Sequence, residues 1–143
     1  QVARQLADTN RDRAIALLAD ALDEARRIDT SDADRPRALI GVANALFAMD
    51  RTRAWELVGE AAGAANSSGG YSGEDSQLVL KLSTPGINSM RVNSAENFDL
   101  PSIFRTLTKD DYHRAAGLAR NFEADSPRAT ALISVAQALL SDK

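Results

Sequence analysis

Hydrophobic residues in the first half of the chain recur every three or four positions, which is the period of an α-helix with one buried face. When the sequence is shifted by 40 positions, residues 2–25 match residues 42–65 at nine positions without a gap. Matches at one register over this length indicate an internal repeat. The first members of the matching pairs are Val2, Ala3, Leu6, Arg11, Arg13, Ala14, Leu17, Ala21 and Ala25.

Two short signatures mark the repeat, and each one predicts a helix. The first, Val-Ala-x-x-Leu, begins at Val2, Val42 and Val135, with a weaker copy at Ile103. The second, Asp/Asn-x-x-Arg-Ala, begins at Asn10, Asp50 and Asp111. Asp or Asn ahead of a helix accepts hydrogen bonds from the free amides of the first turn, so each of these residues is expected to start a second helix.

The signatures predict four units, each a pair of antiparallel helices, with the first and last units incomplete. The units cover about residues 1–28, 34–66, 100–123 and 126–143. The expected helices are 1–8 and 10–28, 34–49 and 50–66, 100–108 and 111–122, and finally 126–141. Helices this short are marginal alone, so stability must come from stacking each pair on the next. The sequence therefore predicts a single all-α domain over residues 1–143, built as an α-solenoid.

The second helix of each unit resembles the second helix of tetratricopeptide repeats. Small, large and small residues recur there as Ala54, Val58 and Ala61, and in the preceding unit as Ala14, Leu18 and Ala21. The chain departs from that family in its longer spacing of 40 residues and in lacking the aromatic residues of the family's first helix. The resemblance implies stacked helix pairs whose first helices line a concave, peptide-binding face.

The helical period stops between residues 67 and 99. Three glycines near its start argue against a helix there. Leu78, Leu80 and Leu82 then alternate with Val79, Lys81 and Ser83. After Pro85-Gly86, Met90 and Val92 alternate with Arg91 and Asn93. This period of two on either side of a turn signal predicts a β-hairpin whose Leu and Met face lies on the helices, with a connection wider than two residues. The rival interpretation is a helix from about Gly73 to Leu82.

An insertion in a repeat array is often where function lies, because it can change without disturbing the stack. Tyr71, Glu74 and Asp75 are the residues of this insertion that we single out as a possible site, without an assigned chemistry. The alternative is that the insertion is a packing cap for the short first helix of the third unit.

Composition and charge narrow the possible partners. The net charge is −3, which argues against a nucleic-acid groove because phosphate binding needs an excess of Lys and Arg. The chain contains no Cys, so disulfides, thiolate nucleophiles and Cys-ligated metals are excluded. No run of 18 apolar residues is present, so no membrane span is expected. Arg outnumbers Lys and Ala is abundant, which is typical of GC-rich bacterial genomes.

No catalytic or metal-binding signature stands out. His113, the only histidine, falls on the expected exposed first turn of a helix, and no second histidine is available to share a metal. The serines of residues 67–76 have no neighbouring base and no nucleophile-elbow pattern. Trp55 lies beside the apolar stripe of its helix and is expected in the core. We therefore expect no cofactor.

One polar row is a candidate for partner binding. Position 44 and its counterparts in the other units face away from the apolar arc of each first helix. If these helices line the concave side, the row could hold an extended peptide or its carboxylate. The row consists of Arg4, Asn44, Arg105 and Gln137.

The function expected from the sequence is a non-catalytic helical scaffold that binds a protein or peptide. The alternative is part of an enzyme whose site lies in residues 67–99 or outside the chain. Because the chain begins and ends inside helix pairs, we expect a fragment of a longer array, with any signal sequence outside it. The compartment stays open, with the cytoplasm favoured, and the oligomeric state is not predicted.

Overall fold

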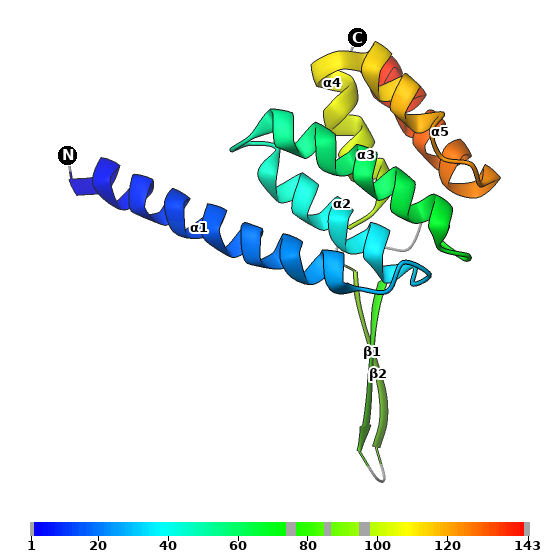
Figure 1. Ribbon diagram of the computed structural model, residues 1–143, viewed down its shortest axis with the longest axis horizontal. Helices are drawn as coiled ribbons and strands as arrows, with labels where there is room; N and C mark the ends of the chain where they lie inside the picture. Colours follow the sequence, from blue (N-terminus) through cyan, green and yellow to red (C-terminus); the bar gives the residue numbers. More distant parts are fainter. Residues whose placement is uncertain (1, 74–76, 85–86, 95–97, 142–143) are drawn as a thin grey trace.

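The computed structural model describes residues 2–73, 77–84, 87–94 and 98–141. These residues form five α-helices and one antiparallel pair of strands (Figure 1). In chain order the elements are α1 (Val2–Arg27), α2 (Asp34–Leu46), α3 (Arg51–Ser67), β1 (Gln77–Thr84), β2 (Ile87–Ser94), α4 (Leu100–Ala119) and α5 (Asp125–Ser141).

The helices form one body in which neighbours along the chain pack together. α2 packs on α3, and α4 packs on α5. The second half of α1 lies along α2, and α4 contacts both α2 and α3, so it joins the two pairs (Figure 1). The prediction of a helical fold class is confirmed for this body.

The core runs through all of the helices and is filled mainly by Ala and Leu. Phe104 of α4 and Phe122, just after that helix, are both fully buried, with ring centroids 6.2 Å apart in an edge-on arrangement. Leu22 is 1% exposed and holds α1 to the body. Trp55 is 4% exposed, so its predicted place in the core is confirmed.

Asp110 ties α3 to α4 through two hydrogen bonds. Its Oδ2 accepts from Trp55 Nε1 at 2.9 Å, and its Oδ1 accepts from Arg51 Nη1 at 2.8 Å. The guanidinium of Arg114 lies over the Trp55 ring, 4.5 Å from its centroid. Burying the indole therefore leaves its N–H satisfied, as buried polar groups require.

Two of the three predicted helix starts are present. Asp50 Oδ1 accepts from the backbone amide of Arg53 at 3.2 Å, which caps α3. Asp111 Oδ1 accepts from the amide of Arg114 at 3.1 Å. The backbone of Asp111 is extended (φ −155°, ψ 95°), so α4 consists of two helical segments that meet at this kink.

The third predicted start, at Asn10, is wrong. α1 continues without a break from Val2 to Arg27, so unit one is one long helix and not a helix pair. At Asp50 and Asp111 the helix on each side of the turn packs against the body, and this packing offsets the cost of interrupting the backbone hydrogen bonds. Asn10 is exposed and has no such packing, so the helix continues through it.

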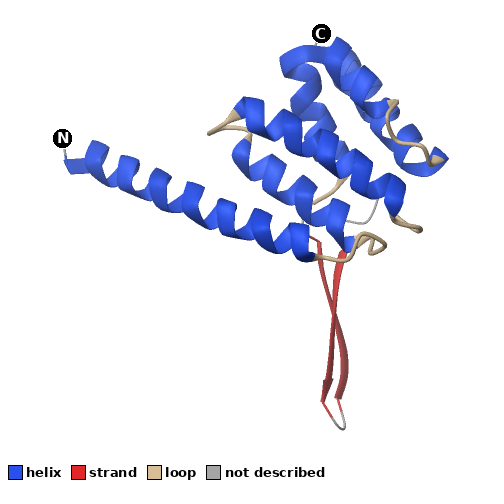
Figure 2. Cartoon of the chain, in the orientation of Figure 1, coloured by secondary structure: helices blue, strands red, loops and turns tan. Residues whose placement is uncertain are grey.

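The strands β1 and β2 pair antiparallel in the second half of the insertion, which excludes the rival helix there. Thr84 pairs with Ile87, whereas the Pro-Gly pair predicts a wider connection; residues 85 and 86 lie outside the described residues. Neither strand contacts a helix, and the pair extends away from the helical body (Figure 2). The prediction that a Leu and Met face lies on the helices is therefore wrong. In the register of the two strands, Met90 pairs with Lys81.

The first part of the insertion does pack on the body. Ser68 and Tyr71 are each 7% exposed, and the carbonyl of Gly73 accepts from the amide of Leu100 at 3.3 Å. Gly73 has φ +80°, and a Cβ there would lie 2.5 Å from Leu100 Cδ1, so this close return to α4 requires glycine. The insertion thus consists of a packed segment followed by a projecting one.

Candidate functional site

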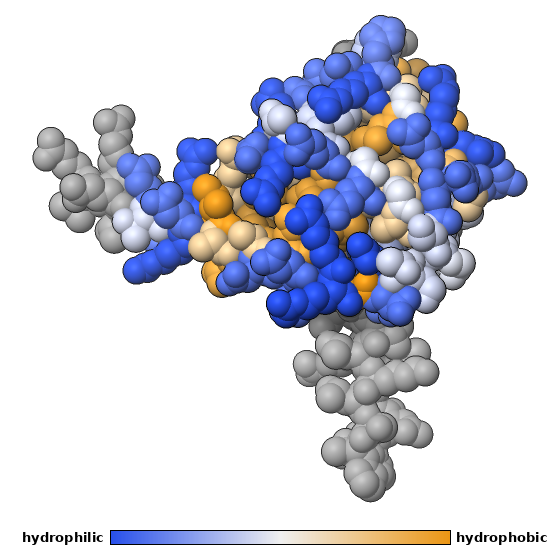
Figure 3. Space-filling model, viewed as in Figure 1, coloured by the Kyte–Doolittle hydropathy of each residue, from blue (hydrophilic) through white to orange (hydrophobic). Residues whose placement is uncertain are grey.

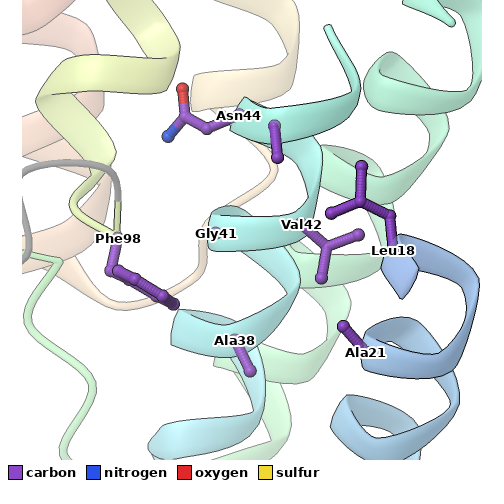
Figure 4. A pocket seen from close by; sticks show the side chains of 8 residues that line it. Leu18, Ala21, Ala38, Gly41, Val42, Asn44 and Phe98 are labelled. Carbon is purple, nitrogen blue, oxygen red and sulfur yellow. The ribbon is translucent and has the colours of Figure 1, made fainter. Parts of the chain in front are cut away.

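An apolar groove of about 450 Å³ crosses α2 and is the main concavity that we consider (Figure 4). Its floor is α2. Side chains of α1 form one wall, and Phe98, from the segment before α4, forms the other. The described lining residues are Leu18, Ala21, Ala38, Gly41, Val42, Asn44, Ala45 and Phe98. Small residues on the floor leave the α2 backbone close to the surface of the groove.

Gly41 makes room for Phe98. A Cβ on Gly41 would lie 2.4 Å from Cε1 and 2.6 Å from Cδ1 of the Phe98 ring, closer than any real contact. The ring therefore lies directly on the α2 backbone, as the close-up view shows (Figure 4). Phe98 remains partly exposed, so one part of the ring packs on α2 while another part faces the groove.

Sequence reasoning missed the role of both residues, although each leaves a signal. Glycine in the middle of an otherwise regular helix often marks a close approach by another group. Phe98 directly precedes Asp99, which caps α4 by accepting from the amide of Ser102 at 2.9 Å. An apolar residue immediately before a helix cap commonly packs back onto the protein.

Of the predicted polar row, Asn44 is the member that lines the groove. Arg105 is exposed on α4, where its Nε donates to the carbonyl of Pro101 at 3.2 Å. Gln137 is exposed on α5, which packs on α4 and does not contact α2. The side chain of Arg4 lies outside the described residues. The described part of the row is therefore spread over three helices, with one member in the groove.

Of the residues singled out in the insertion, Tyr71 is the one that lies among the described residues. Tyr71 is 7% exposed and packs with the hydrophobic core. Glu74 and Asp75 lie outside the described residues. Ser72, beside Tyr71, accepts a hydrogen bond through its carbonyl from Ser126 Oγ at 3.4 Å. This segment thus contacts α5 as well as α4, which is a packing role.

A second, smaller hollow of about 200 Å³ lies beside Glu60 of α3, with Arg35 and Ser67 among its lining residues. Glu60 forms a bidentate salt bridge with Arg26 of α1, in which both N–O distances are 2.9 Å. The hydrogen bond from Arg26 is the main cause that lowers the pKa of Glu60. Because the charge of Glu60 is already engaged in joining α1 to α3, we assign this hollow a structural role.

α5 has apolar residues on two faces. One face, which includes Ala131 and Val135, is buried against α4. On the outer face, Ile133 is 55% exposed and Leu140 is 69% exposed. A helix that is apolar all round is usually covered on both sides. The described part of the chain covers only one.

His113 is exposed and stacks on the ring of Tyr112, with centroids 3.9 Å apart. Within residues 2–73, 77–84, 87–94 and 98–141, no three His, Asp or Glu side chains come together in a way that could hold a metal ion. Over the same ranges, no helix combines the length and the apolar character needed to cross a bilayer. No protein-family model, curated protein or solved structure matches the chain.

Proposed function

We propose that the chain is a non-catalytic helical scaffold, a stack of tetratricopeptide-like helix pairs, that binds a protein or peptide in the groove on α2. The observation that carries the proposal is the character of this groove. It is open and mostly apolar, and it has one amide side chain, Asn44, among its described lining residues. Binding sites commonly combine an apolar lining with a few polar groups that set the orientation of the ligand.

The groove suits an extended segment with one or two apolar side chains. Its volume of about 450 Å³ exceeds that of a single side chain. Leu18 and Phe98 supply apolar walls, and Val42 is an apolar part of the floor. The amide of Asn44 carries donors and an acceptor, so it can hydrogen-bond to the backbone of a bound segment. The floor of Ala and Gly residues lets that backbone approach α2 closely.

The proposal is tested by selecting random peptides displayed on phage for binding to the chain. We expect the selected peptides to share apolar anchor residues. Ala45→Glu puts a charge in the groove at an exposed position, and we expect it to weaken binding of these peptides at least tenfold, since a charge facing an apolar side chain loses hydration. Ala136→Glu, at an exposed position in the middle of α5, is the matched control.

The outcomes separate the groove from other surfaces. Loss of binding in Ala136→Glu together with full binding in Ala45→Glu would move the site to the outer face of α5. Equal binding by both variants and the unchanged chain would refute both locations. Asn44→Ala, Arg105→Ala and Gln137→Ala then test the polar row: we expect Asn44→Ala to have the largest effect, because of these three residues only Asn44 lines the groove.

A further inference from the structure

The first half of α1 extends beyond the other helices (Figure 1). Leu17 is 68% exposed, and Ala21 is also exposed. At about 100° per residue, Ala14, Leu17 and Ala21 lie on the same stripe of the helix as Asn10. This stripe adjoins the one through Leu22 and Ala25 that is buried against the body. Apolar surface on and beside α1 is visible in the space-filling view (Figure 3).

The same residues are buried where they recur in α3. Leu17 and Ala21 correspond, 40 residues on, to Leu57 and Ala61, which are 2% and 0% exposed. The helix that packs against α3 most closely is α2, which contributes the Val-Ala-x-x-Leu signature beginning at Val42. The apolar face of α3 is thus covered by a neighbouring helix with that signature.

α1 contains both parts of the α2–α3 contact in one helix: the covering signature and the apolar face that the signature covers. Its first turns carry the Val-Ala-x-x-Leu signature at Val2, and its later turns carry the face that the signature covers around Leu17. Because α1 is straight, these two halves lie on the same rod and cannot touch. Leu6 and Leu17 are eleven positions apart, which is roughly 16 Å along the helix. The missing cover must therefore come from another helix.

A second copy of the chain supplies both halves at once. In the α2–α3 pair, Leu46 and Ala54 lie on either side of the turn; their counterparts in α1 are Leu6 and Ala14. An antiparallel pair of α1 helices that places Leu6 of each copy near Ala14 of the other has its two-fold axis beside Asn10. Such a symmetric contact buries the apolar face of α1 in both copies to the same extent.

We propose that α1 is a dimerisation helix that pairs antiparallel with α1 of a second copy, centred on Asn10. The overlapping stretch of about 20 residues is roughly 30 Å long, enough to form a coiled-coil-like seam of small and large residues. Asn10 of each copy then lies next to its counterpart at the axis. A single polar residue in an apolar seam sets the register, because a shifted seam leaves its amide without a partner.

Sedimentation equilibrium of the unchanged chain and of two exposed-leucine variants tests the dimer. Leu17→Glu places a charge in the seam, and Leu140→Glu places the same charge on α5, at an almost equally exposed leucine (68% and 69%). We expect the chain and Leu140→Glu to be dimers and Leu17→Glu to dissociate at least ten times more readily. Circular dichroism should show equal helix content in all three, since both leucines are exposed. A monomeric chain, or equal dimerisation by Leu17→Glu, would overturn the proposal.

Spin labels test the direction and centre of the pairing, which the absence of cysteine makes straightforward. With the axis beside Asn10, the backbone at an Arg13→Cys label lies about 13 Å from its copy, and the backbone at an Asp20→Cys label lies about 30 Å from its copy. Short distances at both sites would mean a parallel pair and would overturn the proposal. A monomer in which labels at Arg4→Cys and Asp20→Cys approach within about 12 Å, and not the roughly 24 Å of a straight helix, would mean that α1 folds back on itself and would also overturn it.

Discussion

Because Gly41 contacts Phe98, we expect the effect of Gly41→Ala on the free energy of unfolding to depend on residue 98: destabilising with Phe98 and stabilising with Phe98→Ala. Gly41→Ala alone adds a Cβ that would lie 2.4 Å from the Phe98 ring, so the ring must leave its place on α2. Overpacking of this kind costs about 1–3 kcal/mol. Replacing Gly by Ala inside a helix returns about 1 kcal/mol through helix propensity. We therefore expect Gly41→Ala to lower the free energy of unfolding by about 1 kcal/mol.

In the Phe98→Ala background the obstacle is gone, and only the gain in propensity remains. Gly41→Ala should then raise the free energy of unfolding by about 1 kcal/mol, which gives a coupling between the two positions of about 2 kcal/mol. Urea unfolding followed by circular dichroism on the four chains of this cycle measures the coupling. If Gly41→Ala stabilises both backgrounds equally, the reasoning that places Phe98 on the α2 backbone is refuted.

Three further predictions concern the packing and charge of the helical body. Asp110→Ala should lower the free energy of unfolding in urea by about 1–3 kcal/mol, because the buried Trp55 N–H loses its acceptor. Asp111→Ala removes a helix cap and should lower it by about 1 kcal/mol. A smaller effect of Asp110→Ala than of Asp111→Ala would contradict the role given to Asp110. Phe122→Ala should cost about 3–5 kcal/mol, and a loss below 1 kcal/mol would show that Phe122 is not in the core. Arg26 lowers the pKa of Glu60, so the pair stabilises the fold at pH values above the ordinary glutamate pKa and loses this effect as the pH falls through the lowered pKa. Arg26→Ala should therefore destabilise the chain more at neutral pH than in acid. A stability difference between Arg26→Ala and the unchanged chain that does not vary with pH would argue against the pair.

The sequence predicts the local helix signals of this fold well. Asp50 and Asp111 are recognisable as caps because an acidic residue there precedes an Arg-Ala start and an apolar stripe, and both accept the expected backbone amide. Trp55 is recognisable as a core residue from its place in the helical period. These signals are carried by residues within a few positions of one another, so a single sequence is enough to find them.

Features that depend on distant contacts could not be predicted in the same way. Asn10 has the same local pattern as Asp50, yet α1 continues through it. At Asn10 no packing of the flanking helices offsets the cost of interrupting the backbone hydrogen bonds. Phe98 becomes a wall of the groove only because Gly41, far away in the sequence, leaves room for its ring. The alternation in β1 and β2 contains no information about which surface, if any, lies against either face.

The chain leaves the helical body at Gly73 and rejoins it beside the same residue, at Leu100, so the segment between them can be replaced without moving the helices. Because the Leu100 amide donates to the Gly73 carbonyl at 3.3 Å, the helical body itself holds together the two ends of the segment between these residues. Doubling the length of a flexible loop between ends that are already fixed costs only about 0.6 kcal/mol. Evolution, or an engineer, can therefore lengthen, shorten or replace residues 74–97 while α4 keeps its place. This junction is a natural position for grafting another peptide or a reporter domain onto the protein.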